Sequence, residues 1–186
     1  MDPDEILLDT EAAMEKAFEY MSHEFSAVRT GKASPALVEN IDVEAYGSAM
    51  KLKQLALITT PEPRLLVIQP FDASTTKDIE KAIKESKLGI NPSVDGKIIR
   101  LPIPALSEER RKDLVKGIKQ MAEEARVRMR SARRDGIDAI KKSQKGGEVT
   151  EDEFETYEKE IQKLTDGFVK KIDDALINKE TDILKV

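Results

Sequence analysis

The segment SEERRKDLVKGIKQMAEEARVRMRSARRDGIDAIKKSQK, residues 107–145, has helical periodicity along its whole length. Ser107 is suited to cap the start of this helix, and Glu108 and Glu109 place negative charge in its first turn. At about 1.5 Å per residue the helix would be nearly 60 Å long. Its apolar and small residues recur at steps of three and four and share one stripe: Leu114, Ile118, Met121, Ala125, Met129, Ala132, Gly136 and Ile140.

Two other segments carry stripes of the same kind, one on each side in the sequence. The glycines of Lys145-Gly146-Gly147 end the long helix, and Thr150 with Glu153 forms a capping box for the next one. Such stripes are typical of helices that pack side by side at shallow angles, so we predict an antiparallel three-helix bundle. The two stripes are Met14, Phe18, Met21, Phe25 and Val28, and then Phe154, Tyr157, Ile161, Leu164, Phe168, Ile172 and Leu176.

The residues between the first two helices have a different pattern. Short runs rich in β-branched and aliphatic residues predict strands, and Ser74 or Thr75 is suited to cap a short helix. The predicted fold class is therefore α+β: an elongated three-helix bundle (residues 1–30 and 105–186) with a small α/β domain (residues 31–104) inserted between helices 1 and 2. The predicted strands are 41–45, 55–59, 65–68 and 98–101.

An inserted domain requires the chain to cross between the two domains twice. We place the crossings near 29–31 and 101–104, and predict a two-strand hinge that includes Thr30, Gly31, Pro102 and Pro104. Paired short linkers allow swinging but restrict its direction. A rigid orientation is the alternative.

Composition excludes several classes of site. The chain has no cysteine and one histidine, so it has no disulfide framework, no thiolate metal site and no cysteine nucleophile. We find no catalytic constellation, no phosphate-binding glycine loop and no metal or cofactor site, so the chain is not expected to be an enzyme. The acidic N-terminus and the lack of a long apolar run predict a cytoplasmic protein without a membrane span.

Charge is distributed unevenly along the sequence. The net charge is −5, but residues 107–145 hold 13 bases and seven acids, while residues 1–28 and 146–186 are strongly acidic. A basic segment inside an acidic protein suggests a polyanionic partner. The alternative is that the basic helix compensates two acidic neighbours.

The arginines of the long helix are the most informative residues. Turning about 100° per residue from the apolar stripe places Arg130 and Arg134 near the opposite pole of the helix, with Arg126 and Arg133 on one flank and Arg128 on the other. Arginine binds phosphate through a planar pair of donors, so a rigid helix of this kind suits the backbone of structured RNA. The alternative is a solvated face whose flanking arginines pair with acids of neighbouring helices.

Several blocks of the sequence resemble the ribosome recycling factor family. Each block is weak alone, but together they follow the family's order over nearly the whole chain. Ile90 stands where the family often has leucine, and Gly136 adds a helix-weakening residue. The blocks are Arg29-Thr30-Gly31-Lys32-Ala33-Ser34-Pro35, Glu80-Lys81-Ala82-Ile83, Leu88-Gly89-Ile90-Asn91-Pro92, Glu108-Glu109-Arg110-Arg111-Lys112, Arg133-Arg134-Asp135 and Gln162-Lys163-Leu164-Thr165-Asp166.

The resemblance implies a monomer that acts mechanically on ribosomes after translation termination. It implies binding to the large ribosomal subunit and its rRNA, and subunit splitting together with elongation factor G, a GTPase. Carried over by motif, the first RNA contacts are Arg29, Arg111, Arg130 and Arg133, with Arg110, Arg126 and Arg134 as neighbours.

Other functions stay open at the level of sequence. A helical adaptor or chaperone would use the acidic and basic helices to bind proteins, with weak salt dependence. A related ribosome-binding protein that stalls or stores ribosomes is harder to distinguish from a recycling factor by sequence. An enzyme would need a pocket that the sequence does not display.

Overall fold

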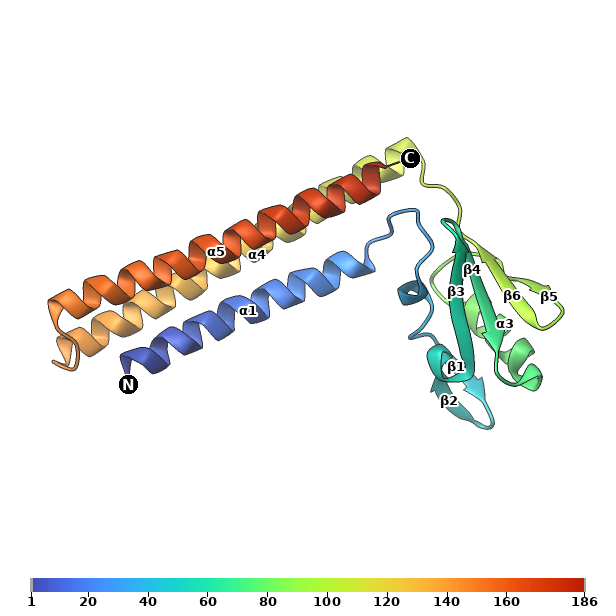
Figure 1. Ribbon diagram of the computed structural model, residues 1–186, viewed down its shortest axis with the longest axis horizontal. Helices are drawn as coiled ribbons and strands as arrows, with labels where there is room; N and C mark the ends of the chain where they lie inside the picture. Colours follow the sequence, from blue (N-terminus) through green and yellow to red (C-terminus); the bar gives the residue numbers. More distant parts are fainter. Residues whose placement is uncertain (1, 186) are drawn as a thin grey trace. The chain divides into compact units, whose positions relative to one another are not determined.

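The computed structural model describes residues 2–185, which form two compact units (Figure 1). The chain leaves the helical unit after Val28 and returns to it at Arg111, and residues Arg29–Arg110 form the other unit. The predicted boundaries were 30/31 and 104/105, so residues 29–30 and 105–110 lie in the smaller unit. Of these, residues 108–110 are the first residues of a helix (Glu108–Lys145) that continues into the helical unit.

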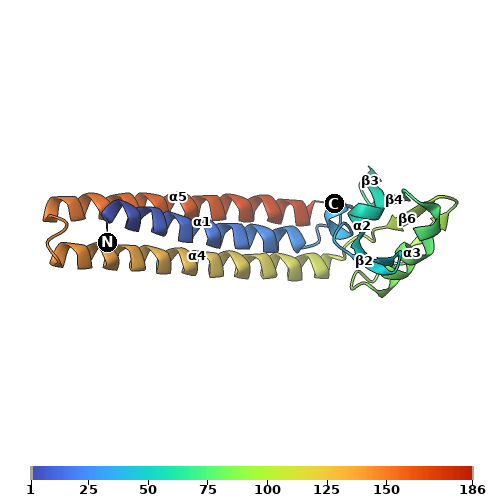
Figure 2. The same cartoon turned by 90° about the horizontal axis from the view of Figure 1, so that it is seen from below.

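The helical unit consists of three long helices that run alongside one another (Figure 2). They are α1 (Pro3–Ala27), α4 (Glu108–Lys145) and α5 (Glu151–Leu184). Helix α4 has the length predicted from its periodicity, and α5 continues two turns beyond the end of its predicted stripe. None of the helices in the described part of the chain combines the length and apolar character needed to cross a lipid bilayer.

The starts of α4 and α5 are capped by the predicted residues. Ser107 Oγ accepts the Arg110 N–H at 3.1 Å at the start of α4. At the start of α5, Thr150 Oγ1 accepts the Glu153 N–H at 3.3 Å, and Glu153 accepts the Thr150 N–H at 2.8 Å. This reciprocal pair is the predicted capping box. Between the two helices, Gly147 has a φ of 78°, which turns the chain.

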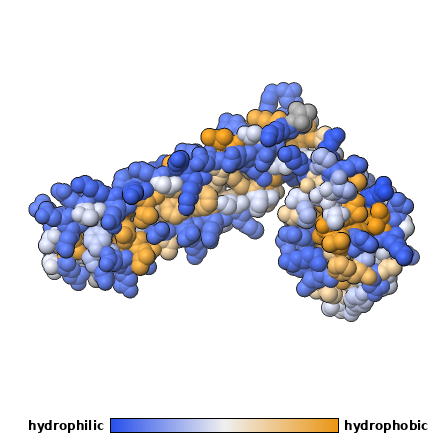
Figure 3. All heavy atoms as spheres, viewed as in Figure 1, coloured by the Kyte–Doolittle hydropathy of each residue, from blue (hydrophilic) through white to orange (hydrophobic). Residues whose placement is uncertain are grey.

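Most of the buried bundle core comes from the predicted stripes, but Ile6, Ala122 and Ile183 are buried and lie outside them. Figure 3 shows hydrophobic residues gathered along the seams between the helices, with hydrophilic residues covering the outer sides. At Gly136 the helices approach closely: a Cβ there would lie 2.5 Å from Thr10 Oγ1. The glycine that weakens α4 as an isolated helix therefore allows α1 to approach. The fully buried residues include Met14, Met21, Ile118, Ala122, Met129, Ile140, Ile161 and Ile172.

The smaller unit contains two antiparallel sheets, so it is of the α+β kind. One pairs β1 (Asp42–Ala45) with β2 (Ser48–Lys51). The other has the order β3-β4-β6-β5 and consists of β3 (Ala56–Glu62), β4 (Leu65–Pro70), β5 (Ser93–Asp95) and β6 (Ile98–Pro102). The helical elements are η1 (Pro35–Leu37), α2 (Leu52–Leu55), η2 (Ala73–Thr75) and α3 (Thr76–Glu85).

The four predicted strands correspond to β1, β3, β4 and β6, but several short elements of this unit, including β2, β5, α2 and η1, were not predicted. Strand β5 is exposed at all its positions, and β2 has no fully buried residue, so neither shows a period-two hydrophobic signal. Both exist because a neighbouring strand supplies their hydrogen bonds. Helix α2 is only one turn long. The core packs α3 against β1 and β6, with Ile79 and Ile83 fully buried.

The predicted hinge residues do not have equivalent surroundings. Pro102 is the last residue of β6 and pairs with Leu65, and the next residue, Ile103, is buried and donates its N–H to the Arg64 carbonyl at 2.8 Å. The segment outside the sheet therefore begins at Pro104, not at Pro102. In the first crossing Thr30 precedes Gly31, which has a φ of 78° and lies close to the side chain of Leu106. The two crossing segments thus lie beside each other.

Candidate nucleic-acid interface

The arginines of helix α4 between residues 126 and 134 point in three directions. Arg126 and Arg133 face α5, where they reach Asp173 and Gln162. Arg128 faces α1, with its guanidinium 4.4 Å from the centre of the Tyr20 ring. Arg130 and Arg134 are exposed. The two flanks are those expected from the helical wheel.

On the α5 side, arginine charge is compensated by acids. Arg126 Nε donates to Asp173 Oδ1 at 3.0 Å, and its Nη1 donates to Glu123 Oε2 at 3.2 Å. The hydrogen bond to Asp173 is the main reason why the pKa of Arg126 lies above its ordinary value. Farther along the same flank, Lys119 pairs with Glu180 at 3.7 Å. The alternative of paired arginines is therefore realised at Arg126, which links α4 to α5.

Arg133 is held more weakly on the same side. Its Nη1 donates to Gln162 Oε1 at 3.1 Å, and Gln162 in turn donates to Asp166 at 2.8 Å. An amide carries no net charge, so this contact orients Arg133 without neutralising it. Arg133 keeps a full positive charge at the boundary between α4 and α5.

At the outer pole of α4, Arg130 and Arg134 differ in their partners. Arg130 Nη2 donates to Glu123 Oε1 at 2.9 Å, and half of its side chain is exposed. The hydrogen bonds from Arg130, and then from Arg126, hold the pKa of Glu123 below its usual value. Arg134 forms no hydrogen bond or ion pair with any residue between 2 and 185. Exposed ion pairs are weak, so both guanidinium groups can bind a phosphate.

Two lysines extend this outer face along the helix. Lys116 and Lys141 are exposed, and neither has a polar partner within the described part of the chain. We use the term outer basic face for Lys116, Arg130, Arg134 and Lys141. Glu123 and Val127 interrupt it, as the helical wheel predicts.

Three further predicted residues lie near the ends of the small unit. The Nε atoms of Arg29 and Arg111 are buried, and neither has a hydrogen-bond partner among residues 2–185. A buried guanidinium N–H without a partner is unfavourable and can be satisfied by a ligand oxygen. Arg110 is exposed, and its backbone N–H is used by the Ser107 cap.

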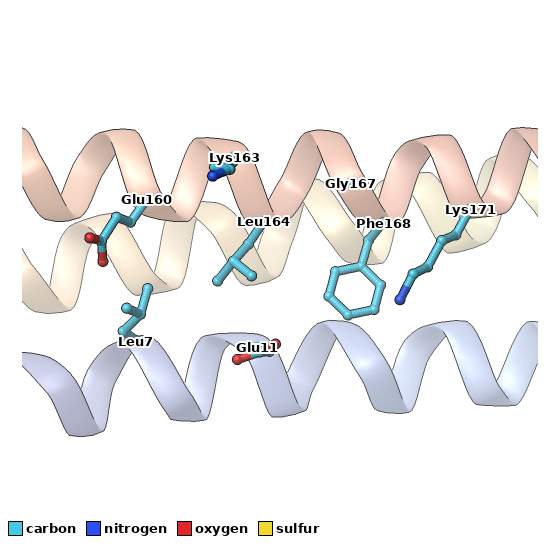
Figure 4. A pocket seen from close by; sticks show the side chains of 8 residues that line it. All are labelled: Leu7, Glu11, Glu160, Lys163, Leu164, Gly167, Phe168 and Lys171. Carbon is cyan, nitrogen blue, oxygen red and sulfur yellow. The ribbon is translucent and has the colours of Figure 1, made fainter.

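The bundle also has a groove between α1 and α5, and none of the residues that line it is an arginine (Figure 4). Its volume is about 460 Å³, and Leu7, Leu164 and Phe168 supply apolar walls. Glu11, Glu160 and Lys163 lie at its rim, and the Lys171 ammonium lies 4.7 Å from the Phe168 ring centre. With both signs of charge at its rim, the groove is not an anion site.

The structure also shows a feature that the sequence did not reveal. The contact between Tyr20 and Arg128 depends on how α1 is rotated against α4, and Tyr20 lies outside the apolar stripe of its own segment. Within residues 2–185, no group of three or more His, Asp or Glu side chains is arranged to hold a metal ion.

Comparisons with known proteins agree along the whole chain. A sequence model of the family described as ribosome recycling factor matches residues 21–184. The ribosome-recycling factor of Akkermansia muciniphila is 59% identical over 188 residues, covering 100% of both chains. That of Rubrobacter xylanophilus is 50% identical over 180 residues, covering 97% of each.

Solved structures of ribosome recycling factors have the same fold. A solution structure matches with a TM-score of 0.82 and 41% identity, covering 100% of this chain and 99% of the other. A second match is the T. thermophilus factor, described together with E. coli elongation factor G bound to the E. coli post-termination complex. Its TM-score is 0.68 and its identity 45%, with both chains covered completely. The chain belongs to the ribosome recycling factor family.

Proposed function

We propose that this protein recycles ribosomes after translation termination. It binds the post-termination complex through the large subunit and, with elongation factor G and GTP, helps to separate the subunits. The proposal is supported by membership of the family and by the related factor described with elongation factor G on a post-termination complex.

The observation that carries the RNA-binding part of the proposal is the outer basic face of α4. Lys116, Arg134 and Lys141 have no acidic partner within the described chain. The only acidic partner of Arg130 there is Glu123, which is exposed. A straight helix holds these charges at fixed spacing, which suits the phosphates of structured rRNA. Arg133 adds a charged group at the edge of this face, and Arg126 contributes least because Asp173 and Glu123 already bind it.

Arg29 and Arg111 are the second set of proposed RNA contacts. Each has a buried Nε without a hydrogen-bond partner in the described chain, so an RNA oxygen would reach it only after the side chain moves towards solvent. Arg110 is an exposed neighbour of this set.

The mechanism we propose is mechanical, and this chain makes or breaks no bond. The bundle anchors on rRNA while the GTPase supplies free energy through the small unit. Force then passes through the two connecting segments, residues 28–31 and 104–107. Thr30, Gly31 and Pro104 belong to these crossings, so they are the residues where the proposed hinge would bend.

The decisive experiment measures splitting of post-termination ribosomes by light scattering, with and without elongation factor G and GTP. We expect dissociation only when the protein, elongation factor G and GTP are all present. Replacement of GTP by a non-hydrolysable analogue is the control. Salt-sensitive binding without splitting would instead indicate a ribosome-binding protein with another task.

A further inference from the structure

A groove between α1 and α4 opens directly beside the outer basic face. It is a shallow groove, open to solvent, with a volume of about 420 Å³. Ala13, Ala17 and Ala132 leave it open, because their side chains end at Cβ. The other lining residues are Lys16 and Tyr20 from α1, and Arg128, Ser131 and Asp135 from α4.

One wall of this groove is a stacked pair. The Arg128 guanidinium lies over the Tyr20 ring at 4.4 Å, and Tyr20 is still 49% exposed. Arg128 forms no ion pair with any residue between 2 and 185, although Glu24 and Glu124 line a small cavity together with it. Unpaired RNA bases stack on aromatic rings and on arginine planes of this kind. The wall therefore suits a flat, electron-rich ring.

The opposite end of the groove has a hydrogen-bond acceptor. Asp135 is exposed and has no polar partner within the described chain. An ionised carboxylate only accepts hydrogen bonds. Guanine is the base whose Watson–Crick edge offers two adjacent donors, N1–H and the N2 amino group, so its edge matches the two carboxylate oxygens. The other bases place an acceptor beside each donor.

The groove lies next to the groups that would hold an RNA backbone. Ser131 in the groove and Arg134 on the outer basic face are three residues apart, and therefore neighbours on the surface of α4. A phosphate bound at Arg134 would place its adjacent nucleotide at the mouth of the groove.

We infer that the α1–α4 groove binds an unpaired guanine of RNA, stacked on the Tyr20–Arg128 pair and held by Asp135. The inference rests on the proposed function, because it requires the RNA backbone to be bound at Arg130 and Arg134. The groove would add recognition of a base to the proposed phosphate contacts of the outer basic face.

The test uses RNA hairpins that share one stem and differ in a single bulged nucleotide: guanine, adenine, cytosine, uracil or none. Binding of the full-length protein is followed by fluorescence anisotropy at several salt concentrations. We expect the guanine bulge to bind about tenfold more tightly than the other bulges, as for a bidentate base contact. Asp135→Asn should abolish this preference. Asp138→Asn is the matched control, since it removes the same charge one turn away without lining the groove.

A second variant tests stacking. Tyr20→Leu keeps an apolar side chain on α1, so it should preserve the bundle yet weaken binding of the guanine-bulged hairpin about tenfold. Binding of the hairpin without a bulge should not change. Salt-dependent binding that is equal for all bulges would overturn the groove inference and leave the proposed RNA contact intact. Failure to bind any hairpin, at any salt concentration, would overturn both.

Discussion

At the scale of single residues, Arg126 and Arg134 show how position on one helix divides arginines between structure and recognition. They lie about two turns apart on α4. Arg126 is bound by Asp173 and Glu123, whereas Arg134 has no polar partner among residues 2–185. A phosphate can bind Arg134 without displacing a carboxylate, so we expect Arg134 to contribute more to RNA binding than Arg126.

We therefore predict that Arg134→Ala weakens binding to the large ribosomal subunit severalfold. The slope of log affinity against log salt concentration should become shallower by about one, as expected for one lost phosphate contact. Sedimentation binding at several salt concentrations measures both quantities. Lys170→Ala is the control, because it removes an exposed positive charge from α5. Equal losses in the two variants would contradict a specific role for Arg134.

At the scale of elements, helices α1 and α4 approach each other closely at Gly136. A methyl group there would lie 2.5 Å from Thr10 Oγ1, 3.0 Å from Thr10 Cγ2 and 3.4 Å from Ile161 Cδ1. Thr10 is buried, and its hydroxyl donates to the Ile6 carbonyl at 2.7 Å, so it is not free to turn away. The position combines a poor helix former with a tight helix crossing.

Gly136→Ala should therefore destabilise the bundle. The gain in helix propensity is about 1 kcal/mol, and overpacking costs about 1–3 kcal/mol. Gly117→Ala on the same helix is the matched control and should stabilise the protein, because a Cβ there meets no atom within 4 Å. Thermal unfolding followed by circular dichroism compares the two. Adding Thr10→Ala should rescue Gly136→Ala, and a stabilised single variant would refute the packing argument.

The start of α1 is tied to α5 by Tyr157, whose hydroxyl donates to Asp4 Oδ1 at 2.7 Å. This hydrogen bond is the main cause that raises the pKa of Tyr157 to about 12, from an ordinary value of 10. The folded state therefore favours the protonated phenol. Its contribution to stability is complete below pH 10 and is lost as the pH rises towards 12.

We predict that Tyr157→Phe unfolds more easily than the unaltered protein at pH 8. The difference in free energy of unfolding between the two proteins should shrink steadily between pH 10 and pH 12. Ionisation of Tyr157 removes the hydrogen bond to Asp4 that the substitution also removes. Denaturant unfolding at a series of pH values measures it. Tyr20→Phe serves as the control, since the Tyr20 ring faces a cation rather than a carboxylate. A difference independent of pH would contradict the assignment.

At the scale of the whole molecule, two units are joined by two chain crossings, and the proposed mechanism needs both to bend. The second crossing begins only after Ile103, because Pro102 and Ile103 are held by the small unit's sheet. A test of the hinge must therefore alter the residues after Ile103 and leave both the sheet and the Ser107 cap of α4 intact.

Deletion of Ala105 meets these conditions. We expect the shortened protein to bind the large subunit normally and to split post-termination ribosomes more slowly, because the tighter connection restricts swinging. Stopped-flow light scattering gives the rate, and Ala105→Gly at the same site controls for the change of side chain. Splitting at the original rate would favour the rigid alternative.

Some elements of the fold could be predicted from the sequence and others could not, for a physical reason. Helices α1, α4 and α5 were predictable because each has a long apolar stripe and the caps of α4 and α5 use residues close in sequence. Strands β2 and β5 were not, because their stability comes from pairing with a neighbouring strand rather than from their own pattern. For the same reason the sequence did not reveal that Pro102 belongs to strand β6 and not to the hinge, since this depends on its pairing with Leu65.

The amino-acid sequence by itself determined the three helices, the inserted domain and the concentration of arginines on one helix, because periodicity, capping and charge are local properties. Only the tertiary structure decided which arginines are compensated. The Arg126–Asp173 contact joins residues 47 positions apart and depends on how α5 is rotated against α4. The same rotational freedom, between α1 and α4, decided that Tyr20 lies under Arg128 and that a groove opens beside the outer basic face.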